Sequence, residues 1–261
     1  MIELKTPDEI EAMKQAGRLS AAVLREVGAR VEPGVSTYEL DRFAEEYIRD
    51  NGGIPTFKGY GGFPGTICAS VNEEVVHGFP SKKRVLKEGD VISIDVGATV
   101  DGWAGDNAWT FPVGKVAPEV KRLLDVTEEC LWAAIEMARA GKRLGDIGSA
   151  CQRVAKAAGF GVVREFTGHG IGRQMHEEPS VPNYGHRHLG RKLRSGMVLA
   201  IEPMITMGSP RVVIAENGWL VTTADKKPAA HFEKTVAITE EGPALISVEP
   251  TRRRPVGGAN Y

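Results

Sequence analysis

The chain has 261 residues, of which 42% are hydrophobic and 26% charged, and its formal net charge is −1. This balance is typical of a soluble globular protein and gives no general attraction to nucleic acid or membranes. The chain does not open with a signal-peptide pattern, it has no run of about eighteen apolar residues, and its three cysteines form no CxxC pair. We therefore expect a cytoplasmic protein without disulfide bonds.

The N-terminal part predicts two helices followed by strands. Each helix opens with a capping box, in which a hydroxyl residue and a glutamate three positions later bond each other's backbone groups: Thr6 with Glu9, and Ser36 with Glu39. Asn51-Gly52-Gly53 ends the second helix, and a glycine-rich loop over 58–65 follows. Residues 66–71 predict a strand, and residues 91–109 predict a β-hairpin that turns at Asp101-Gly102.

The rest of the chain repeats that order, with helices predicted over 118–140 and 146–158. The strands predicted after them cover 162–167, 197–206, 211–222 and 232–239. The recurrence hints at a duplicated α+β unit, although no residue-by-residue repeat supports it. We expect one domain over residues 1–249, with antiparallel strands and helices covering one face, and a loose C-terminal tail over 250–261.

Two aspartates of the predicted hairpin form the first candidate site. Asp95 lies in an apolar strand, where a charged group is costly unless it is paired or bound to a metal. If the turn is at Asp101-Gly102, Asp95 is opposite Ala108. Asp106 is two residues from that partner, so both carboxylates face the same side. Facing carboxylates repel each other, and a cation relieves the repulsion. The alternative is that Asp106 belongs to an exposed turn and Asp95 to a solvated edge.

Two histidines lie seven residues apart in the segment 168–179. His169 is flanked by glycines, which allow a close backbone approach, and His176 follows in the same segment. A lone histidine is more often structural than a ligand. His186 and His188 nearby show that histidine also occurs here in an ordinary basic loop. The pair in a glycine-rich loop nevertheless favours a functional role.

Two glutamates lie in apolar runs that predict strands, Glu202 within MVLAIEPMI and Glu233 at the start of another run. Buried acids rarely stabilise a fold, although each could be neutral or paired with Lys234 or Arg211. Carboxylates with an imidazole suit Mn²⁺, Fe²⁺, Co²⁺ or Zn²⁺. Four carboxylates exceed what one cation needs, so we expect two metal ions.

These residues resemble the type I methionine aminopeptidases, which have the pita-bread fold. The resemblance covers the chain from its first helix to just beyond Glu233. It implies a curved antiparallel sheet with helices on its outer face and two halves related by a pseudo-twofold axis. The five metal ligands of that family, in chain order, correspond here to Asp95, Asp106, His169, Glu202 and Glu233. Two further active-site histidines of the family correspond to His77, in NEEVVHGFP, and His176.

The resemblance implies removal of the initiator methionine from nascent proteins and peptides with a small second residue. Two divalent ions, Co, Mn, Fe or Zn, would be used, with a hydroxide that bridges them as nucleophile. Asp95 would bind one metal bidentately, and the peptide's free α-amine would be a ligand of that same metal. His169 and Glu202 would bind the other metal, and Asp106 and Glu233 would bridge the two.

The remaining roles in that family concern the proton and the substrate. Glu202 would carry the proton, His176 would stabilise the tetrahedral intermediate, and His77 would contact the substrate beside the scissile bond. By motif position, the apolar methionine pocket has these walls: Tyr60, Phe63, Cys68, Met175 and Trp219, with His77 at the edge. Such residues are equally typical of a hydrophobic core.

Two departures qualify the resemblance, and other details extend it. Asn107 stands where a small or hydroxylic residue is expected, and Met175 stands where an aromatic residue is common, so the strictness of methionine preference is open. The family also holds a monovalent cation, Na or K, through backbone carbonyls near Asn72 and Glu74.

His176 and Glu202 are 26 positions apart, which leaves no room for the helical insertion of type II enzymes. The absence of a cysteine-rich N-terminal extension favours a bacterial type I enzyme.

Three alternative functions differ in what they explain. A proline-specific aminopeptidase or dipeptidase of the same fold would share all five ligands, but such enzymes usually carry a large N-terminal domain, and Trp219 favours the methionine enzyme. A non-catalytic relative that binds nucleic acid or protein would lack metal ligands, which are all present here. A mononuclear iron oxygenase using His169 and His176 would leave three buried acids unexplained.

The expected partners are nascent polypeptides and peptides that begin with methionine, with no DNA or membrane partner, and the protein is expected to be a monomer. Residues 186–194 are basic, with cations at Arg187, Arg191, Lys192 and Arg194. This segment is most simply a solvated surface loop. The alternative is transient docking of the loop on ribosomal RNA, where nascent chains emerge.

Overall fold

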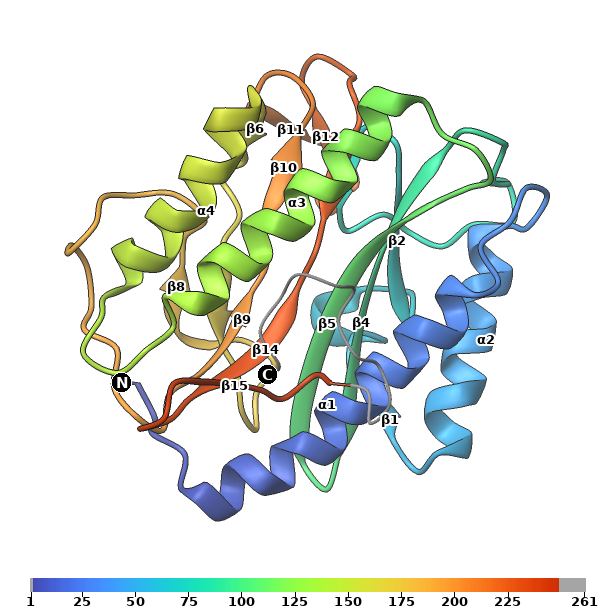
Figure 1. Cartoon of the computed structure of the whole chain (residues 1–261). Helices are drawn as coiled ribbons and strands as arrows, with labels where there is room; N and C mark the ends of the chain where they lie inside the picture. Colours follow the sequence, from blue (N-terminus) through green and yellow to red (C-terminus); the bar gives the residue numbers. More distant parts are fainter. Residues whose placement is uncertain (1, 249–261) are drawn as a thin grey trace.

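The computed structural model describes residues 2–248, and its helices cover one side of antiparallel strands (Figure 1). The helices are α1 (Pro7–Gly28), α2 (Thr37–Asp50), α3 (Pro118–Glu136) and α4 (Leu144–Ala158). Both predicted capping boxes are present, at Thr6 for α1 and at Ser36 for α2. In each, the N-cap hydroxyl accepts the backbone N–H three residues later at 3.3 Å, so the start of both helices is set locally.

A long β-hairpin carries the first part of the candidate site. Strands β4 (Val91–Val100) and β5 (Trp103–Pro112) pair from end to end and bend across the molecule beside α1 (Figure 1). Asp101 and Gly102 form the turn with φ of 49° and 77°, left-handed values that a tight two-residue turn requires. The predicted hairpin and its turn are confirmed.

The other strands form antiparallel sheets around this hairpin. The first sheet adds β1 (Ile54–Pro55) and β2 (Ile67–Val71) to β4. A five-stranded sheet contains, in spatial order, β15 (Pro243–Leu245), β14 (Lys234–Ile238), β9 (Val198–Ile201), β7 (Gly168–Gly170) and β8 (Glu177–Val181). Two three-stranded sheets contain β13 (Ala229–His231), β10 (Met204–Thr206) and β6 (Gly161–Val162), and then β11 (Val212–Ile214), β12 (Val221–Thr223) and β3 (Glu74–Val76).

The strand predicted over 197–206 is wrong in one respect, because it breaks into β9 and β10 at Glu202-Pro203. Proline has no backbone N–H, so it cannot continue a ladder on both sides. Before the break, β9 pairs with β7 and β14. After it, β10 pairs with β6 and β13. The chain therefore changes sheets at the glutamate, and Glu202 lies in the break and not in the middle of a strand.

Other predicted elements are shorter than expected. Helix α3 ends at Glu136 instead of residue 140, because the following segment turns to pair with residues 191–193: the N–H of Gly141 donates to the carbonyl of Leu193, and the N–H of Leu193 donates to the carbonyl of Lys142. The run predicted over 162–167 separates into the end of β6 and a connection to β7. The run over 211–222 is two strands, and Phe232 and Glu233 precede β14. The glycine-rich loop contains a short 3₁₀ turn, η1 (Tyr60–Gly62).

Separate apolar clusters lie under the two helix pairs. One joins α1 and α2 to the hairpin sheet, and another joins α3 and α4 to the strands after them. A third cluster lies between them, beside the candidate site.

Among the described residues, no helix has both the length and the apolar character that a membrane crossing needs. The predicted tail over 250–261 lies outside the described residues, and the domain boundary at 249 stays a prediction.

Gly105 on β5 is a contact point between α1 and the hairpin. A Cβ added there would lie 2.5 Å from backbone atoms of Ala16 and Gly17 in α1, and Gly105 has no left-handed φ. Without this contact, a change to alanine would stabilise the protein slightly by restricting the unfolded chain. With it, we expect Gly105→Ala to destabilise and Gly105→Val to cost about 1–3 kcal/mol through overpacking. Urea unfolding measures both, and stability that rises in Gly105→Ala would contradict the contact.

Candidate metal centre

The hairpin brings two carboxylates to one face. Asp95 is opposite Ala108, and Asp106 is opposite Gly97, as the sequence predicted. Asp106 is buried, and its backbone is held by Thr235 of β14: its N–H donates to the Thr235 hydroxyl at 3.2 Å, and that hydroxyl donates to its carbonyl at 2.9 Å. This pair of contacts ties the hairpin sheet to the five-stranded sheet at the site.

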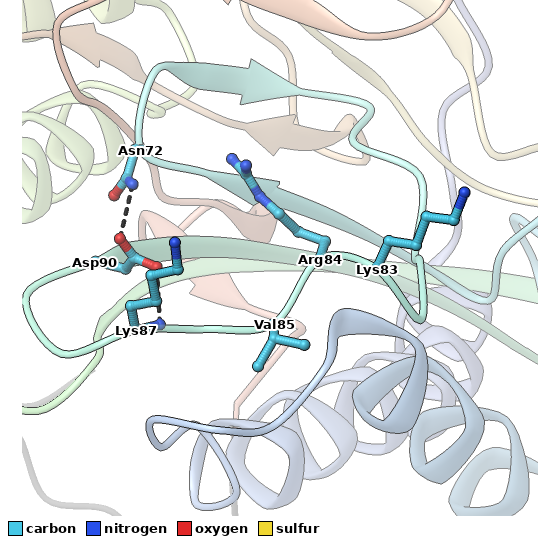
Figure 2. Close-up of a pocket in the computed structure, with 6 residues that line it drawn as sticks. All are labelled: Asn72, Lys83, Arg84, Val85, Lys87 and Asp90. Atoms are coloured by element: carbon cyan, nitrogen blue, oxygen red, sulfur yellow. Dashed lines mark hydrogen bonds between the residues drawn. The ribbon is translucent and has the colours of Figure 1, made fainter.

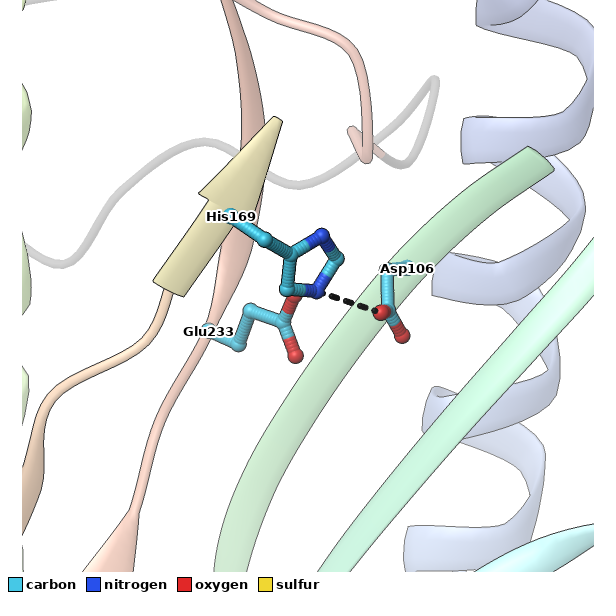
Figure 3. A group of neighbouring side chains, drawn as sticks. All are labelled: Asp106, His169 and Glu233. Carbon is cyan, nitrogen blue, oxygen red and sulfur yellow. Dashed lines mark ion pairs between the residues drawn. The ribbon is translucent and has the colours of Figure 1, made fainter. Parts of the chain in front are cut away.

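His169, on β7, faces Asp106 of the hairpin from the other side of the candidate site (Figure 3). A Cβ on either flanking glycine, Gly168 or Gly170, would lie 2.3 Å from a neighbouring carbonyl oxygen, so only glycine permits this strand spacing. The His169 Nδ1–H donates to the Gly170 carbonyl at 2.9 Å, which leaves the lone pair on Nε2. Nε2 is 3.6 Å from Asp106 Oδ2 and 3.6 Å from Glu202 Oε1.

The two glutamates complete the group from places where strands stop. Glu202 follows β9, and Glu233 precedes β14. Lys234 and Ile201 form the terminal pair of the β14–β9 ladder. Glu233 directly precedes Lys234 and Glu202 directly follows Ile201, so the two glutamates lie at the same end of this ladder. Ligand atoms of Asp106, His169 and Glu233 all lie within 4.8 Å of one another, and Figure 3 shows these side chains converging from three strand segments. Glu202 Oε1 is 3.6 Å from His169 Nε2, and Asp95 lies on β4, which pairs with the strand that carries Asp106.

Two carboxylate oxygens in the centre, Asp95 Oδ1 and Glu233 Oε1, are buried and have no hydrogen-bond partner among the described residues. Burial raises the pKa of Asp95 well above its usual range, and the charges of Asp106 and Glu202 raise it further. Burial and the same neighbours raise the pKa of Glu233. Orphaned oxygens on mutually repelling acids are what a divalent cation satisfies, so these residues fit a metal centre.

Of the two cationic side chains predicted as alternative partners for the glutamates, Lys234 lowers the pKa of Glu233 but does not outweigh its burial and the nearby acids. Arg211 is exposed, and Lys234 donates to Asn107 Oδ1 at 2.8 Å. Asn107, which the sequence marked as a departure, is therefore the partner of this lysine.

His176 and His77 lie at the edge of the centre. The ring of His176 is 4.3 Å from that of His169, and its Nδ1 is 2.9 Å from the Tyr60 hydroxyl. If that hydroxyl donates, the proton of His176 is on Nε2, free to meet a substrate. Burial lowers the pKa of both histidines. His77 has a φ of 62°, a strained value for a non-glycine residue that is most often tolerated at functional sites.

The predicted pocket residues divide into two groups. Phe63, Cys68, Met175 and Trp219 belong to the apolar cluster beside the centre. Cys68, on β2, is opposite Asp95 of β4. Gly97 is opposite Asp106, and a Cβ added to Gly97 would lie 2.3 Å from the methyl group of Met175. Cys68 and Met175 therefore lie beside the strand positions that carry or face the two aspartates. Tyr60 is 46% exposed and lies instead against His176, with ring centres 5.3 Å apart.

One histidine of the site was missed by the sequence analysis. His231, at the end of β13, is buried, and its Nε2 is 3.4 Å from Glu202 Oε2. Its spacing of two residues from Glu233 was a usable signal, because alternate residues of an extended segment share a face.

The monovalent cation expected near Asn72 and Glu74 stays a prediction. Asn72 has a φ of 58°, and its side-chain amide donates to Asp90 at 2.9 Å. Figure 2 shows the adjoining cavity of about 220 Å³, which is lined by Asn72, Lys83, Arg84, Val85, Lys87 and Asp90. Its cationic side chains do not suit a cation, so any such ion would depend on backbone carbonyls outside this cavity.

Comparison with known proteins assigns the class. Residues 11–240 match the model of metallopeptidase family M24. The chain belongs to this family of metal-dependent peptidases.

Its relatives narrow the assignment. Methionine aminopeptidase 1 of Bacillus subtilis is 51% identical over 242 residues, covering 93% of this chain and 97% of the relative. The methionine aminopeptidase of Clostridium acetobutylicum is 49% identical over 248 residues, covering 95% and 99%. The crystal structure of methionine aminopeptidase from Thermotoga maritima is 47% identical, with a TM-score of 0.94 over 95% of this chain and all of that one. The predicted resemblance to type I methionine aminopeptidase, the enzyme class and the α+β pita-bread fold are confirmed.

The ionisable groups predict how pH affects the metal-free protein. The acids near His169 outweigh its burial and raise its pKa from 6.5 to about 9. The folded chain therefore binds more protons than the unfolded chain between these values, and stability falls as pH rises through the window. Asp95 and Glu233, whose pKa values are also raised, act in the same direction. We expect the melting temperature of EDTA-treated protein to fall from pH 6.5 to pH 9.

Two additions separate this effect from general alkaline destabilisation. Mn²⁺ at pH 9 should restore the melting temperature, because a bound cation replaces the protons. The variant His169→Gln should show a smaller fall over the window. A melting temperature that rises between pH 6.5 and pH 9 in the metal-free protein would contradict the arrangement of charges.

Proposed function

We propose that the protein removes the N-terminal methionine from nascent chains and peptides with a small second residue, using two divalent cations. The observation that carries the proposal is the buried group of acids with orphaned oxygens, in a chain about half identical to proteins named methionine aminopeptidase. The number of carboxylates supports two cations over one.

The chain's residues divide into those that hold the cations and those that face the peptide. Asp106, His169 and Glu233, whose ligand atoms all lie within 4.8 Å of one another, would include the shared ligands, with Asp95 and Glu202 completing the set. Bound divalent cations supply an activated water and polarise the scissile carbonyl. The lone pair that the Gly170 carbonyl leaves on His169 Nε2 makes this histidine a ligand and not an acid.

Proton transfer and charge stabilisation fall to residues at the edge. Glu202 would receive the proton of the attacking water and pass it to the departing amine. His176 would donate a hydrogen bond to the carbonyl oxygen as negative charge develops, with Tyr60 holding its other nitrogen. His77 would bond the peptide beside the scissile bond. In these roles, Glu202 accepts a proton, and His176 and His77 donate hydrogen bonds to the same peptide unit.

The apolar cluster beside the aspartates supports a preference for methionine. Phe63, Cys68, Met175 and Trp219 offer aromatic and sulfur surface suited to an unbranched thioether. Met175 has three rotatable bonds where an aromatic ring would be rigid, so norleucine and other unbranched side chains should be accepted more readily than branched ones.

Peptide hydrolysis separates this function from the proline-specific alternative. Met-Gly-Met should lose its methionine, Met-Lys peptides should react more slowly, and peptides that begin Xaa-Pro with Xaa other than methionine should stay intact. EDTA should abolish the release, and Mn²⁺, Co²⁺, Fe²⁺ or Zn²⁺ added singly should restore it to different extents. Glu233→Ala should lower kcat/KM by more than about 100-fold. It removes a residue that would bind the metal directly, and losing a residue that only hydrogen-bonds a metal ligand already costs about 10–100-fold. Activity that survives both EDTA and Glu233→Ala would reject the metal mechanism.

We further propose that the protein acts in the cytoplasm as a monomer and meets its substrates at the ribosome. The basic segment 186–194 supports this contact, because Arg187, Arg191, Lys192 and Arg194 are all exposed. Hydrogen bonds join the segment to residues 141–144, where Arg143 is opposite Lys192, so further cations share the same surface. Clustered exposed cations suit the phosphates of ribosomal RNA.

Charge reversal tests the ribosome contact. The double variant Arg187→Glu and Arg191→Glu should lower co-sedimentation with ribosomes at low salt, since each lost phosphate contact weakens binding and reduces its salt dependence. Hydrolysis of Met-Gly-Met should be unchanged, because these side chains lie outside the metal centre. Co-sedimentation equal to that of the wild type would reject the contact and leave the peptidase function intact.

A further inference from the structure

His231 lies against the metal centre but has no part in the proposed mechanism. It ends β13, two residues before Glu233, and is 1% exposed. Across the pairing of β13 with β10 it is opposite Met204, two residues after Glu202. The fold therefore places this buried imidazole next to both glutamates of the centre.

The backbone of His231 is fixed on the hairpin side. Its N–H donates to the Thr110 hydroxyl at 2.9 Å, and that hydroxyl is also 2.9 Å from its carbonyl oxygen. The same Thr110 oxygen is 2.9 Å from the hydroxyl of Ser93, its partner on β4. With β10 on the other side, the ring has little freedom to move away from the glutamate.

One ring nitrogen of His231, Nε2, lies near the carboxylate of Glu202. His231 Nε2 is 3.4 Å from Glu202 Oε2, and this buried nitrogen makes no hydrogen bond to any described residue. A buried imidazole nitrogen with no partner is unfavourable, so Nε2 is directed at the carboxylate. The other oxygen, Oε1, is 3.6 Å from His169 Nε2. The Glu202 carboxylate thus lies between two histidines, one near each oxygen.

We propose that His231 is a positioning residue for Glu202. Its Nε2–H donates to Oε2 and orients the carboxylate, so that Oε1 faces the cations and the attacking water. The inference rests on the proposed function, in which Glu202 binds a cation and carries the proton. Glu202 is held at its backbone as well, since its carbonyl accepts from the Asn183 amide at 2.9 Å. The side chain, however, depends on His231 for its second oxygen.

Three variants separate hydrogen bonding from packing. His231→Gln keeps an N–H donor near the position of Nε2, whereas His231→Leu and His231→Met fill a similar volume without a donor. We expect Leu and Met to lower kcat for Met-Gly-Met by about 10–100-fold, the usual effect of losing an outer partner of a ligand, with KM little changed. His231→Gln should retain most of the activity. His186→Leu, at an exposed histidine, is the matched control and should behave as the wild type.

A second readout does not require turnover. Calorimetric titration of the metal-free proteins with Mn²⁺ should show one binding step weakened about tenfold or more in His231→Leu and His231→Met, and near wild type in His231→Gln. Circular dichroism and melting of the metal-free forms establish that each variant is folded. Having two donorless variants keeps the comparison available if one of them does not fold.

Each outcome decides the matter. Donorless variants that match the wild type in kcat and Mn²⁺ affinity would overturn the proposal, and so would a glutamine variant that falls as far as leucine. If the wild-type protein releases no methionine with any cation, the proposed function is wrong. The Mn²⁺ titrations would then still report whether His231 orients Glu202.

Discussion

Repulsion among buried carboxylates is the constraint around which the rest of the structure is arranged. Asp95 and Glu233 each have an oxygen without a hydrogen-bond partner among the described residues, and burial together with the charges of Asp106 and Glu202 raises the pKa of both. In most interiors such acids would be replaced by apolar residues or matched with cationic side chains. Here Lys234 lowers the pKa of Glu233, but burial and the neighbouring acids outweigh it. The unfavourable charge is therefore retained for a cation to neutralise.

Holding the acids together requires a frame that resists their repulsion. The frame is made of backbone contacts: the full-length pairing of β4 with β5, the Thr235 hydroxyl on the backbone of Asp106, and close glycine contacts beside His169. Apolar clusters under both helix pairs stabilise these strands from behind. The hydrophobic effect of the outer layers thus offsets the electrostatic cost at the centre. A centre built on strands is also held more rigidly than one built on loops.

Much of this was readable in the sequence because its signals are local. The capping boxes at Thr6 and Ser36 and the turn at Asp101-Gly102 each depend on a few adjacent residues, and the turn alone sets the register that aligns Asp95 with Asp106. The break at Glu202-Pro203 was missed because MVLAIEPMI has the composition of a continuous strand, and only the change of pairing partners reveals it. His231 was missed although its spacing of two residues from Glu233 pointed to the site, because its neighbour Glu202 is 29 positions earlier and no local pattern connects the two.

The centre draws on two separate sheets. Asp95 and Asp106 come from the hairpin beside α1 and α2, whereas His169, Glu202 and Glu233 come from the segments that follow α3 and α4. Neither set is a complete ligand shell by itself. Cations bound jointly by residues of both sets must therefore favour association of the two halves, and by the same thermodynamic linkage, loosening one half against the other must weaken their binding. The metal is in this sense a reversible cross-link: its loss would relax the seam between the halves before it unfolded either one.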